Sequence, residues 1–276
     1  FVKEYWDYVF TYFLDELKMG RTPNPDIMCN KYIKFDMFAK EAQKLGADYI
    51  ATGHYARIKD GMLLRGVDSN KDQTYFLSQV SKKQLENVLF PIGDMIKPDV
   101  RKIAEKYDLI TAKKKDSTGI CFIGERNFTK FLENYLPNKE GNIVNIENNE
   151  VLGKHIGLMY YTIGQRKGLG ISYKVPLFVI GFNKERNEVI VGEKSELYKT
   201  HIKVNNINLL LFDKLDNEIE VDVKIRYSSK PAKATIKQVS DTEIEVEFKE
   251  PQRGITPGQS AVFYIDDVLV GGGKIQ

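Results

Sequence analysis

Cys29 is one of two thiols in this sequence, and thiols are residues that can do chemistry. It is the second-last residue of the segment GRTPNPDIMCN (20–30), which packs two prolines and Asp26 into a rigid loop before an expected helix. A thiol at a helix N-terminus is held as thiolate, the nucleophilic form, by the helix dipole. A structural role is the alternative, because free cysteines are often buried and aspartate is also a common capping residue.

Cys121 is the second thiol, and it lies in the segment KKDSTGICFIGER (114–126). The nearby basic side chains would favour the thiolate, whereas the flanking Ile120 and Phe122 argue equally for burial. The two cysteines are 92 positions apart (121 − 29 = 92). Spacing alone leaves open whether they pair, bind a metal or act separately.

The histidines do not suggest a metal site. His54, His155 and His201 are the three in the sequence, and no Cys-x-x-Cys pair accompanies them. Structural zinc sites need four such ligands at close spacing. We therefore expect no metal ligands in this chain.

Two short polar segments are weaker candidates for binding. Gly53 and His54 follow an expected strand, and ligands approach open α/β sheets at strand ends, although a glycine there can simply make a turn. Lys71, Asp72 and Gln73 form a polar loop, and a solvated surface is its default interpretation.

Composition limits the class of protein. The 276 residues, of mass 31.7 kDa, suffice for two or three domains, and 42% hydrophobic with 29% charged residues fits a globular protein. A net charge of +3 means that any polyanion must be bound by local patches. Two cysteines without a signal peptide favour a reducing cytoplasm. The chain opens at Phe1 inside an expected helix, which suggests that residues precede it.

The elements that must position these residues change character near the middle of the chain. Apolar residues at helical spacing predict a helix over 5–17, ended by Gly20, and another over 33–45. The strand expected at 49–51 and the helix expected after Pro98 continue an α/β pattern.

Beyond Pro137 the pattern is that of strands and turns, and the alternation at 219–225 and 244–248 predicts half-buried antiparallel strands. Several such strands in about 75 residues indicate a small barrel or sandwich. We expect three domains, at 1–124, 125–200 and 201–276.

Together these segments resemble the bacterial tRNA-specific 2-thiouridylase family, known as MnmA, over essentially the whole chain. The ordered set is far more specific than any one member. The matching segments are GRTPNPDIMCN (20–30), IKF (33–35), LGADYIATGHYARI (45–58), NKDQTYFLSQV (70–80), KPDVRKIAEKYDL (97–109), DSTGICFIGERNF (116–128), YYTIGQRKGLGI (160–171) and TPGQSAVFY (256–264).

The resemblance implies a fold and a reaction. It implies a partial ATP-pyrophosphatase domain of doubly wound α/β type, a small β-rich central domain and a C-terminal antiparallel β-barrel that helps to hold tRNA. Members use ATP, with Mg²⁺, to adenylate the 2-oxygen of the wobble uridine, and then replace that oxygen with sulfur from a cysteine persulfide. Adenylation converts a poor leaving group into a good one.

The resemblance also implies roles for individual residues. Cys121 would carry the persulfide, Cys29 would complete the exchange through a Cys29–Cys121 disulfide or by freeing sulfide, and Asp26 would be a general acid/base. Asn24, Pro25 and Asp26 match the target-base segment, and Gly53 matches an ATP contact. The positions that match tRNA contacts are His54, Lys71, Asp72, Gln73, Arg226, Tyr227 and Gln259. The implied partners are the anticodon region of tRNA and a persulfide donor such as a cysteine desulfurase or a relay protein, with no membrane.

The sequence departs from the family pattern in three places. The Ser-Gly-Gly-Val-Asp-Ser phosphate-binding loop does not occur in it, so we expect these 276 residues alone to hold ATP phosphates poorly. Tyr32 stands where an acidic residue is expected, and Ser228-Ser229 where relatives often carry a basic group.

Two rival functions stay open. Another ATP-pyrophosphatase would admit nitrogen instead of sulfur and need no cysteine pair. A non-enzymatic RNA-binding protein would keep both cysteines as core residues. Separate Cys→Ser changes distinguish these possibilities, because a pure binder should lose nothing.

Overall fold

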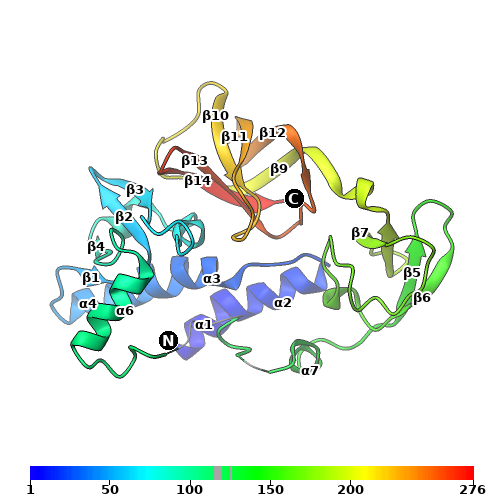
Figure 1. Cartoon of the computed structure of the whole chain (residues 1–276), viewed down its shortest axis with the longest axis horizontal. Helices are drawn as coiled ribbons and strands as arrows, with labels where there is room; N and C mark the ends of the chain where they lie inside the picture. The colour runs from blue at the N-terminus through cyan, green and yellow to red at the C-terminus, as the bar shows by residue number, and fades with distance from the viewer. Residues whose placement is uncertain (115–119, 125) are drawn as a thin grey trace.

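The computed structural model describes residues 1–114, 120–124 and 126–276 and arranges them in three parts (Figure 1). An α/β part lies at one end, a small sheet lies at the other, and a β-barrel sits over the helices between them. In the part of the chain that the structure describes, no helix is long and apolar enough to cross a bilayer.

The first helical run extends from residue 2 to residue 18, as the apolar spacing predicts. Val9, Phe13 and Leu17 recur every four residues and are all buried, so one face of the run packs inward. Gly20 ends it with a left-handed φ of 63°, a conformation that glycine adopts without strain. The run consists of α1 (Val2–Tyr5), the π-helical η1 (Trp6–Phe10) and α2 (Thr11–Lys18).

The second helical run begins eight residues earlier than the sequence pattern predicts. Asn24 caps it, because its side chain accepts a hydrogen bond from the Ile27 backbone N–H, and Pro25 occupies the first helical position. Cys29 is therefore inside a helix and not in a loop before one. The run consists of α3 (Pro25–Met28), the π-helical η2 (Cys29–Phe38) and α4 (Ala39–Lys44).

In the described residues, the α/β sheet consists of two parallel strands. Ile50 of the expected 49–51 strand pairs with Val88, and Ala51 pairs with Leu89. The helix expected after Pro98 is present, with that proline in its first turn. The elements are β1 (Ile50–Ala51), η3 (Thr74–Leu77), α5 (Lys82–Leu85), β4 (Val88–Leu89) and α6 (Lys97–Lys106).

A hairpin that the sequence analysis overlooked follows β1. Asp60 and Gly61 both have positive φ, of 51° and 75°, which suits the tight turn between β2 (Ala56–Lys59) and β3 (Met62–Arg65). The hairpin leaves its own domain to extend the barrel sheet, since Leu64 pairs with Val268.

The central part is a four-stranded sheet in the order β6-β5-β8-β7, preceded by a short helix. Strands β5 and β8 are parallel, whereas the other two pairings are antiparallel. The elements are α7 (Phe128–Leu132), β5 (Gly141–Asn145), β6 (Val151–His155), η4 (Leu158–Tyr160), β7 (Phe178–Asn183), β8 (Glu188–Gly192) and η5 (Lys194–Leu197).

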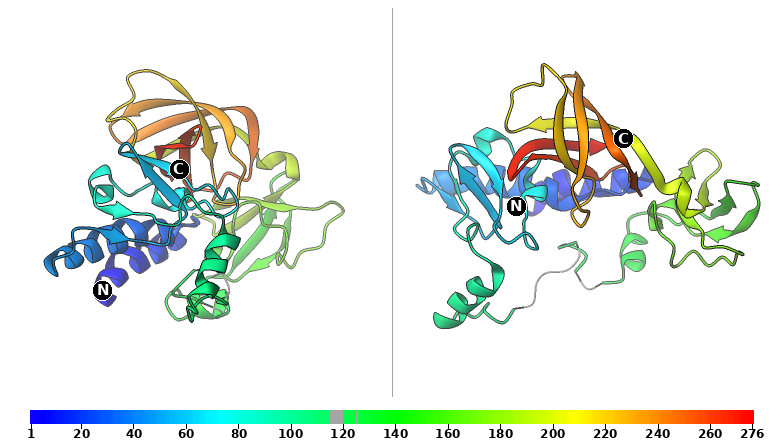
Figure 2. Two further views of the ribbon diagram at one scale, coloured as in Figure 1. Left: turned by 60° about the vertical axis from the view of Figure 1, so that its left-hand side comes forward. Right: turned by 45° about the horizontal axis from the view of Figure 1, so that its top comes forward.

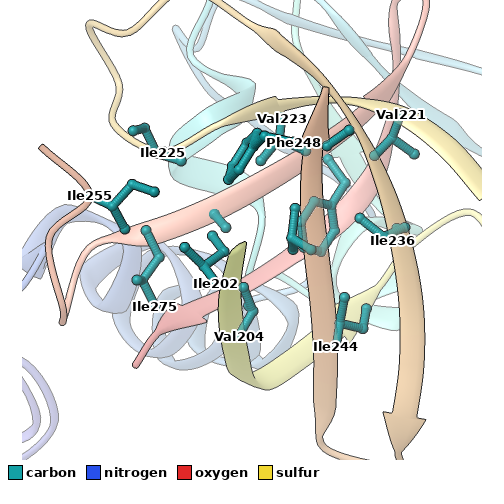
Figure 3. Close-up of a cluster of buried hydrophobic side chains, with 14 of the residues drawn as sticks. Ile202, Val204, Val221, Val223, Ile225, Ile236, Ile244, Phe248, Ile255 and Ile275 are labelled. Atoms are coloured by element: carbon teal, nitrogen blue, oxygen red, sulfur yellow. The ribbon is translucent and has the colours of Figure 1, made fainter. Parts of the chain in front are cut away.

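The C-terminal part is a closed antiparallel barrel in the order β13-β10-β11-β12-β9-β14, completed by pairing of β13 with β14. The alternating apolar residues predicted at 219–225 and 244–248 point into one core (Figure 3). The strands are β9 (Tyr198–Leu209), β10 (Ile219–Lys224), β11 (Ala232–Ser240), β12 (Glu243–Arg253), β13 (Ser260–Ile265) and β14 (Val268–Ile275).

The barrel is docked onto the loop between the two helical runs (Figures 1 and 2). The Thr22 backbone N–H donates a 2.9 Å hydrogen bond to the Pro257 carbonyl. Gly258, with φ of 92°, lies so close that a Cβ there would be 3.0 Å from the Thr22 backbone. Close approach of the barrel to this loop therefore depends on glycine at position 258.

Candidate active site

The segment before Cys29 is anchored at one end by the helix that begins at Pro25 and at the other by hydrogen bonds between Thr22 and the barrel. Ile27 is fully buried in the N-terminal core and anchors the first turn. Asp26 and Cys29 lie one helical turn apart, which places both side chains on the same face. The loop and helix therefore present an acid and a thiol together.

The turn that carries Cys121 is held by aromatic packing. Phe122 makes edge-to-face contacts with Phe10 and Phe13 at centroid distances of 5.2 Å. Arg126 donates to the carbonyl oxygens of Phe122 and Ile123 at 2.5 Å and 3.0 Å. Cys121 itself is exposed. Most of the residues before it in the motif, 115–119, lie outside the described residues.

The structure brings the two thiols and Asp26 together around one hydroxyl group. The Tyr5 hydroxyl lies 3.1 Å from the Cys121 Sγ. Burial raises the pKa of Tyr5, and Cys121, Cys29 and Asp26 raise it further, which requires all three groups to be near it. Both cysteines are free thiols, each close enough for its charge to act on the same hydroxyl.

Burial has the largest effect on the two ionisable groups of the helix. It raises the pKa of Asp26, and it also raises the pKa of Cys29, against the opposing influence of Lys34. The thiolate expected if Cys29 lay at a helix N-terminus is therefore not favoured here. The helix begins at Pro25, so Cys29 is a full turn inside it, and burial is the largest influence on its pKa.

Asp26 and Cys29 lie on one face of the helix, and burial raises the pKa of both groups. A carboxyl group with a raised pKa suits general acid/base work near neutral pH, and a buried thiol needs such a base to become a nucleophile. Tyr5 and Lys34 were not predicted from the sequence as residues of this site. The charge of Lys34 acts on both Asp26 and Cys29. The tyrosine was counted among the apolar positions of a helix, and only folding places it beside Cys121.

Gly53 and His54 follow β1 and differ in exposure. Gly53 is exposed at the carboxyl end of the strand, with only Ile92 within 4 Å of a Cβ built there. His54 is 7% exposed, packs against the rings of Phe35 and Phe90, and shares a 2.8 Å hydrogen bond with Thr52. Burial, with a contribution from Lys34, lowers the pKa of His54 to about 4. Its ring is therefore neutral at neutral pH.

Asp72 and Gln73 are bound within the protein. Asp72 accepts hydrogen bonds from the backbone N–H groups of Gly66 and Thr74, and Gln73 accepts one from the Tyr55 N–H. Asp72 also lines a cavity of about 750 Å³ together with Tyr227. The basic side chains around the same cavity are Arg57, Arg65, Lys224 and Lys230.

Arg226 and Gln259 both connect domains. The Arg226 guanidinium donates to the Ile163 carbonyl of the central domain at 3.0 Å and to the Gly254 carbonyl of the barrel at 2.6 Å. The Gln259 amide donates to the Thr22 carbonyl at 2.9 Å. The structure thus places Asp26, Cys29 and Cys121 where their charges act on one hydroxyl group, and it buries His54 and Asp72.

The described residues do not fit a protein-held metal. Within residues 1–114, 120–124 and 126–276, no group of three His, Cys, Asp or Glu side chains is placed to bind an ion. Mg²⁺ binds proteins through oxygen ligands and often through substrate phosphates. We therefore derive no step through a magnesium ion.

Three family profiles cover the chain in order. Residues 1–125 match the "tRNA methyl transferase HUP domain", residues 129–193 the "tRNA methyl transferase PRC-barrel domain" and residues 199–275 the "Aminomethyltransferase beta-barrel domain". HUP domains of this kind occur in ATP pyrophosphatases, which indicates ATP use.

Curated bacterial relatives align with the whole chain. The tRNA-specific 2-thiouridylase MnmA of Staphylococcus saprophyticus is 55% identical over 284 residues, covering 100% of this chain and 76% of the relative. The enzymes of the same name from Lactiplantibacillus plantarum and Halalkalibacterium halodurans are each 54% identical over 100% of the chain, which covers 77% and 76% of their lengths.

Proposed function

The chain belongs to the tRNA-specific 2-thiouridylase family, and we propose that it acts as a tRNA-uridine 2-sulfurtransferase on the wobble uridine. The observation that carries the proposal is the 3.1 Å contact between the Tyr5 hydroxyl and the Cys121 Sγ, with Cys29 and Asp26 near enough for their charges to raise the pKa of the same hydroxyl. Two thiols and a carboxyl group are what sulfur transfer needs, and a general RNA binder needs none of them.

The first step is activation of the uridine with ATP. The pyrimidine O2 attacks the α-phosphorus of ATP, pyrophosphate leaves, and the uridine C2 then bears AMP, a good leaving group. Gly53 is the proposed ATP contact in this chain, since it is exposed at the carboxyl end of β1, where ligands of parallel sheets bind. Mg²⁺ would accompany the ATP phosphates.

The second step transfers sulfur from Cys121. The outer sulfur of a Cys121 persulfide forms a bond to C2, and the C2–O bond breaks as AMP leaves with the electron pair. Asp26 takes the proton of Cys29, whose thiolate attacks the Cys121 Sγ. The sulfur–sulfur bond then breaks toward C2, leaving 2-thiouridine and a Cys29–Cys121 disulfide that a thiol reductant must reopen.

A second route uses the same groups. Cys29 attacks the Cys121 Sγ of the persulfide before transfer, which frees hydrosulfide and forms the same disulfide. The hydrosulfide then displaces AMP from C2. Both routes need Cys121 as the carrier and Cys29 with Asp26 as the group that releases sulfur.

The tRNA would lie across the domains around this site. We assign the target base to the segment containing Asn24, Pro25 and Asp26, because it leads directly to Cys29. A wobble base lies in a loop and can turn out into a pocket. The proposed tRNA positions are His54, Lys71, Asp72, Gln73, Arg226, Tyr227 and Gln259.

The basic cavity beside Tyr227 supports this placement, because phosphate contacts supply much of the affinity of RNA-binding proteins. The persulfide is proposed to come from a cysteine desulfurase or a relay protein. A reducing cytoplasm would keep both thiols free, as they are in the structure.

The direct test is formation of 2-thiouridine in tRNA by the full-length protein with ATP, Mg²⁺ and a persulfide donor. We expect the modified nucleoside to appear in nuclease digests and to be lost with either Cys29→Ser or Cys121→Ser. Full activity in both variants would contradict sulfur transfer. Tight tRNA binding without any thiolation would favour the binding-protein alternative.

A further inference from the structure

The Tyr5 hydroxyl has no part in the reaction described above, although it lies 3.1 Å from the Cys121 Sγ. Tyr5 is in the first helical run, 116 positions from Cys121, and its ring meets Phe122 edge-on at 6.0 Å. Phe122 is fixed in turn by Phe10 and Phe13. The hydroxyl and the sulfur are therefore held together by packing on both sides.

The direction of this hydrogen bond follows from the surroundings of Tyr5. Burial raises the pKa of its hydroxyl, and Cys121, Cys29 and Asp26 raise it further. Tyr5 consequently keeps its proton over the pH range in which thiols ionise. Toward a Cys121 thiolate, which carries no proton, the hydroxyl is the donor and the sulfur is the acceptor.

We propose that Tyr5 is a further catalytic residue of this site, whose hydroxyl donates a hydrogen bond to the Cys121 sulfur and stabilises it as the thiolate that accepts sulfur. The inference rests on the carrier role proposed for Cys121. It concerns the loading of that carrier, which precedes any contact with ATP or uridine.

Loading is a balanced thiol exchange. The Cys121 thiolate attacks the outer sulfur of a cysteine persulfide on the donor protein, and a new sulfur–sulfur bond forms as the old one breaks. The donor cysteine leaves as a thiolate with the electron pair of the broken bond. No oxidant is consumed, and the anion that attacks is the one to which Tyr5 donates.

The turn that carries Cys121 holds its sulfur beside the Tyr5 hydroxyl before the reaction begins. Arg126 holds the carbonyl oxygens of Phe122 and Ile123, so the backbone just after Cys121 is fixed. A donor already in place stabilises a charge without reorganisation at the moment of reaction. Tyr5→Phe removes the oxygen alone and leaves the ring against Phe122.

The test measures Cys121 alone, in a Cys29→Ser background, by iodoacetamide alkylation followed by mass spectrometry from pH 6 to pH 10. At pH 7 we expect Tyr5→Phe to slow alkylation about threefold, because the loss of thiolate is partly offset by higher nucleophilicity of the thiolate that remains. At pH 10 the variant should react as fast as its parent or faster. Tyr8→Phe, one turn away and stacked on Tyr32 at 5.2 Å, is the matched control and should follow the parent.

A second readout connects the contact to sulfur loading. Initial rates of ³⁵S transfer from a persulfide donor to Cys121 should fall about threefold in Tyr5→Phe and not in Tyr8→Phe. Identical alkylation profiles for Tyr5→Phe and its parent would overturn the proposal. A changed alkylation profile with unchanged loading rates would overturn the catalytic role while leaving the hydrogen bond in place.

Failure of the carrier role is distinguishable from failure of this inference. If Cys121 of the parent takes no label at all, the proposed function fails, and so does the role of Tyr5 in loading, whatever alkylation shows. Any loss of melting temperature in Tyr5→Phe should disappear in a Cys121→Ala background, where the acceptor is missing. A loss of melting temperature that persists there comes from other contacts of Tyr5, and it overturns the assignment of that loss to the sulfur contact.

Discussion

The side-chain amide of Gln259 in the barrel donates a 2.9 Å hydrogen bond to the carbonyl oxygen of Thr22, in the loop that leads to Cys29. A second carbonyl of the same loop, that of Pro23, lies 3.5 Å from the amide nitrogen. The C-terminal domain therefore holds the loop that presents Asp26 and Cys29. In the proposed mechanism, its contribution would include the position of the Cys29 thiol as well as contact with tRNA.

Gln259→Glu tests this positioning. The substitution keeps the shape of the side chain but replaces the donor with a carboxylate that faces two carbonyl oxygens. We expect turnover of 2-thiouridine formation to fall about tenfold, from the lost hydrogen bond and displacement of the loop. Gln252→Glu, where the amide bonds to the Glu250 carbonyl of its own strand, is the control. Equal turnover in the two variants would show that Gln259 does not position the loop that leads to Cys29.

The buried carboxylate of Glu16 is a second connection between the barrel and the loop that leads to Cys29. Glu16 is 3% exposed and accepts hydrogen bonds from Arg21 at 2.7 Å and from Lys274 of the barrel at 3.1 Å. Glu16→Gln leaves two cations without their carboxylate, so we expect the free energy of unfolding to fall by about 3 kcal/mol. This value is at the low end for a broken buried pair, because both cations are partly solvated.

The matched control for Glu16 is Asp15→Asn, the neighbouring acid, which pairs with Lys18 at 2.9 Å on the surface. Exposed pairs contribute about 0–1 kcal/mol, so urea unfolding should hardly change. If Glu16→Gln unfolds at the same urea concentration as Asp15→Asn, the buried cluster does not hold the domains together.

His54 should give stability a specific pH dependence. Its pKa is about 4 in the folded protein and 6.5 without the fold, so folding favours the neutral ring. The stabilisation is complete above pH 6.5 and is lost as the pH falls toward 4. From the size of the pKa shift, the total is about 3 kcal/mol.

Urea unfolding of wild type and His54→Gln from pH 7 to pH 4 measures this effect. The advantage of wild type should shrink by about 3 kcal/mol over the range. Asp26, whose raised pKa acts in the opposite direction, is present in both proteins and cancels in the difference. His201→Gln, on an exposed strand position, controls for loss of an imidazole. A constant difference between wild type and His54→Gln would show that the ring is not buried as described.

Salt dependence separates phosphate contacts from contacts that only support the fold. Lys71→Gln should weaken tRNA binding and reduce the slope of log K against log salt by about 0.7 to 0.9, the loss of one phosphate contact. Arg226→Gln should weaken binding without changing the slope, because the guanidinium is bonded to the Ile163 and Gly254 carbonyl groups. Binding titrations between 50 and 300 mM NaCl measure both, and a flatter slope for Arg226→Gln would assign it to phosphate instead.

The sequence predicts most of the elements but not the contacts that make the site. Helical and alternating apolar patterns identified both helical runs and two of the barrel strands, β10 and β12, because burial of one face imposes those periods. The start of the second helix at Pro25 was missed, although a cap residue followed by proline is a readable signal. The Asp60-Gly61 hairpin was missed in the same way.

Other features could not be inferred from local sequence. The raised pKa of Cys29 depends on burial by distant segments, which overrides its position in a helix. The meeting of Tyr5 with Cys121 joins positions 116 apart. The domain boundaries at 124/125 and 200/201 and the individual tRNA contacts stay predictions.

The central claim is that Cys121 carries sulfur and Cys29 releases it. Incubation of the full-length protein with a ³⁵S-labelled persulfide donor, followed by non-reducing gels, should label wild type and Cys29→Ser but not Cys121→Ser. Neither variant should thiolate tRNA. Label that persists in Cys121→Ser and disappears in Cys29→Ser would contradict the assignment and reverse the two roles.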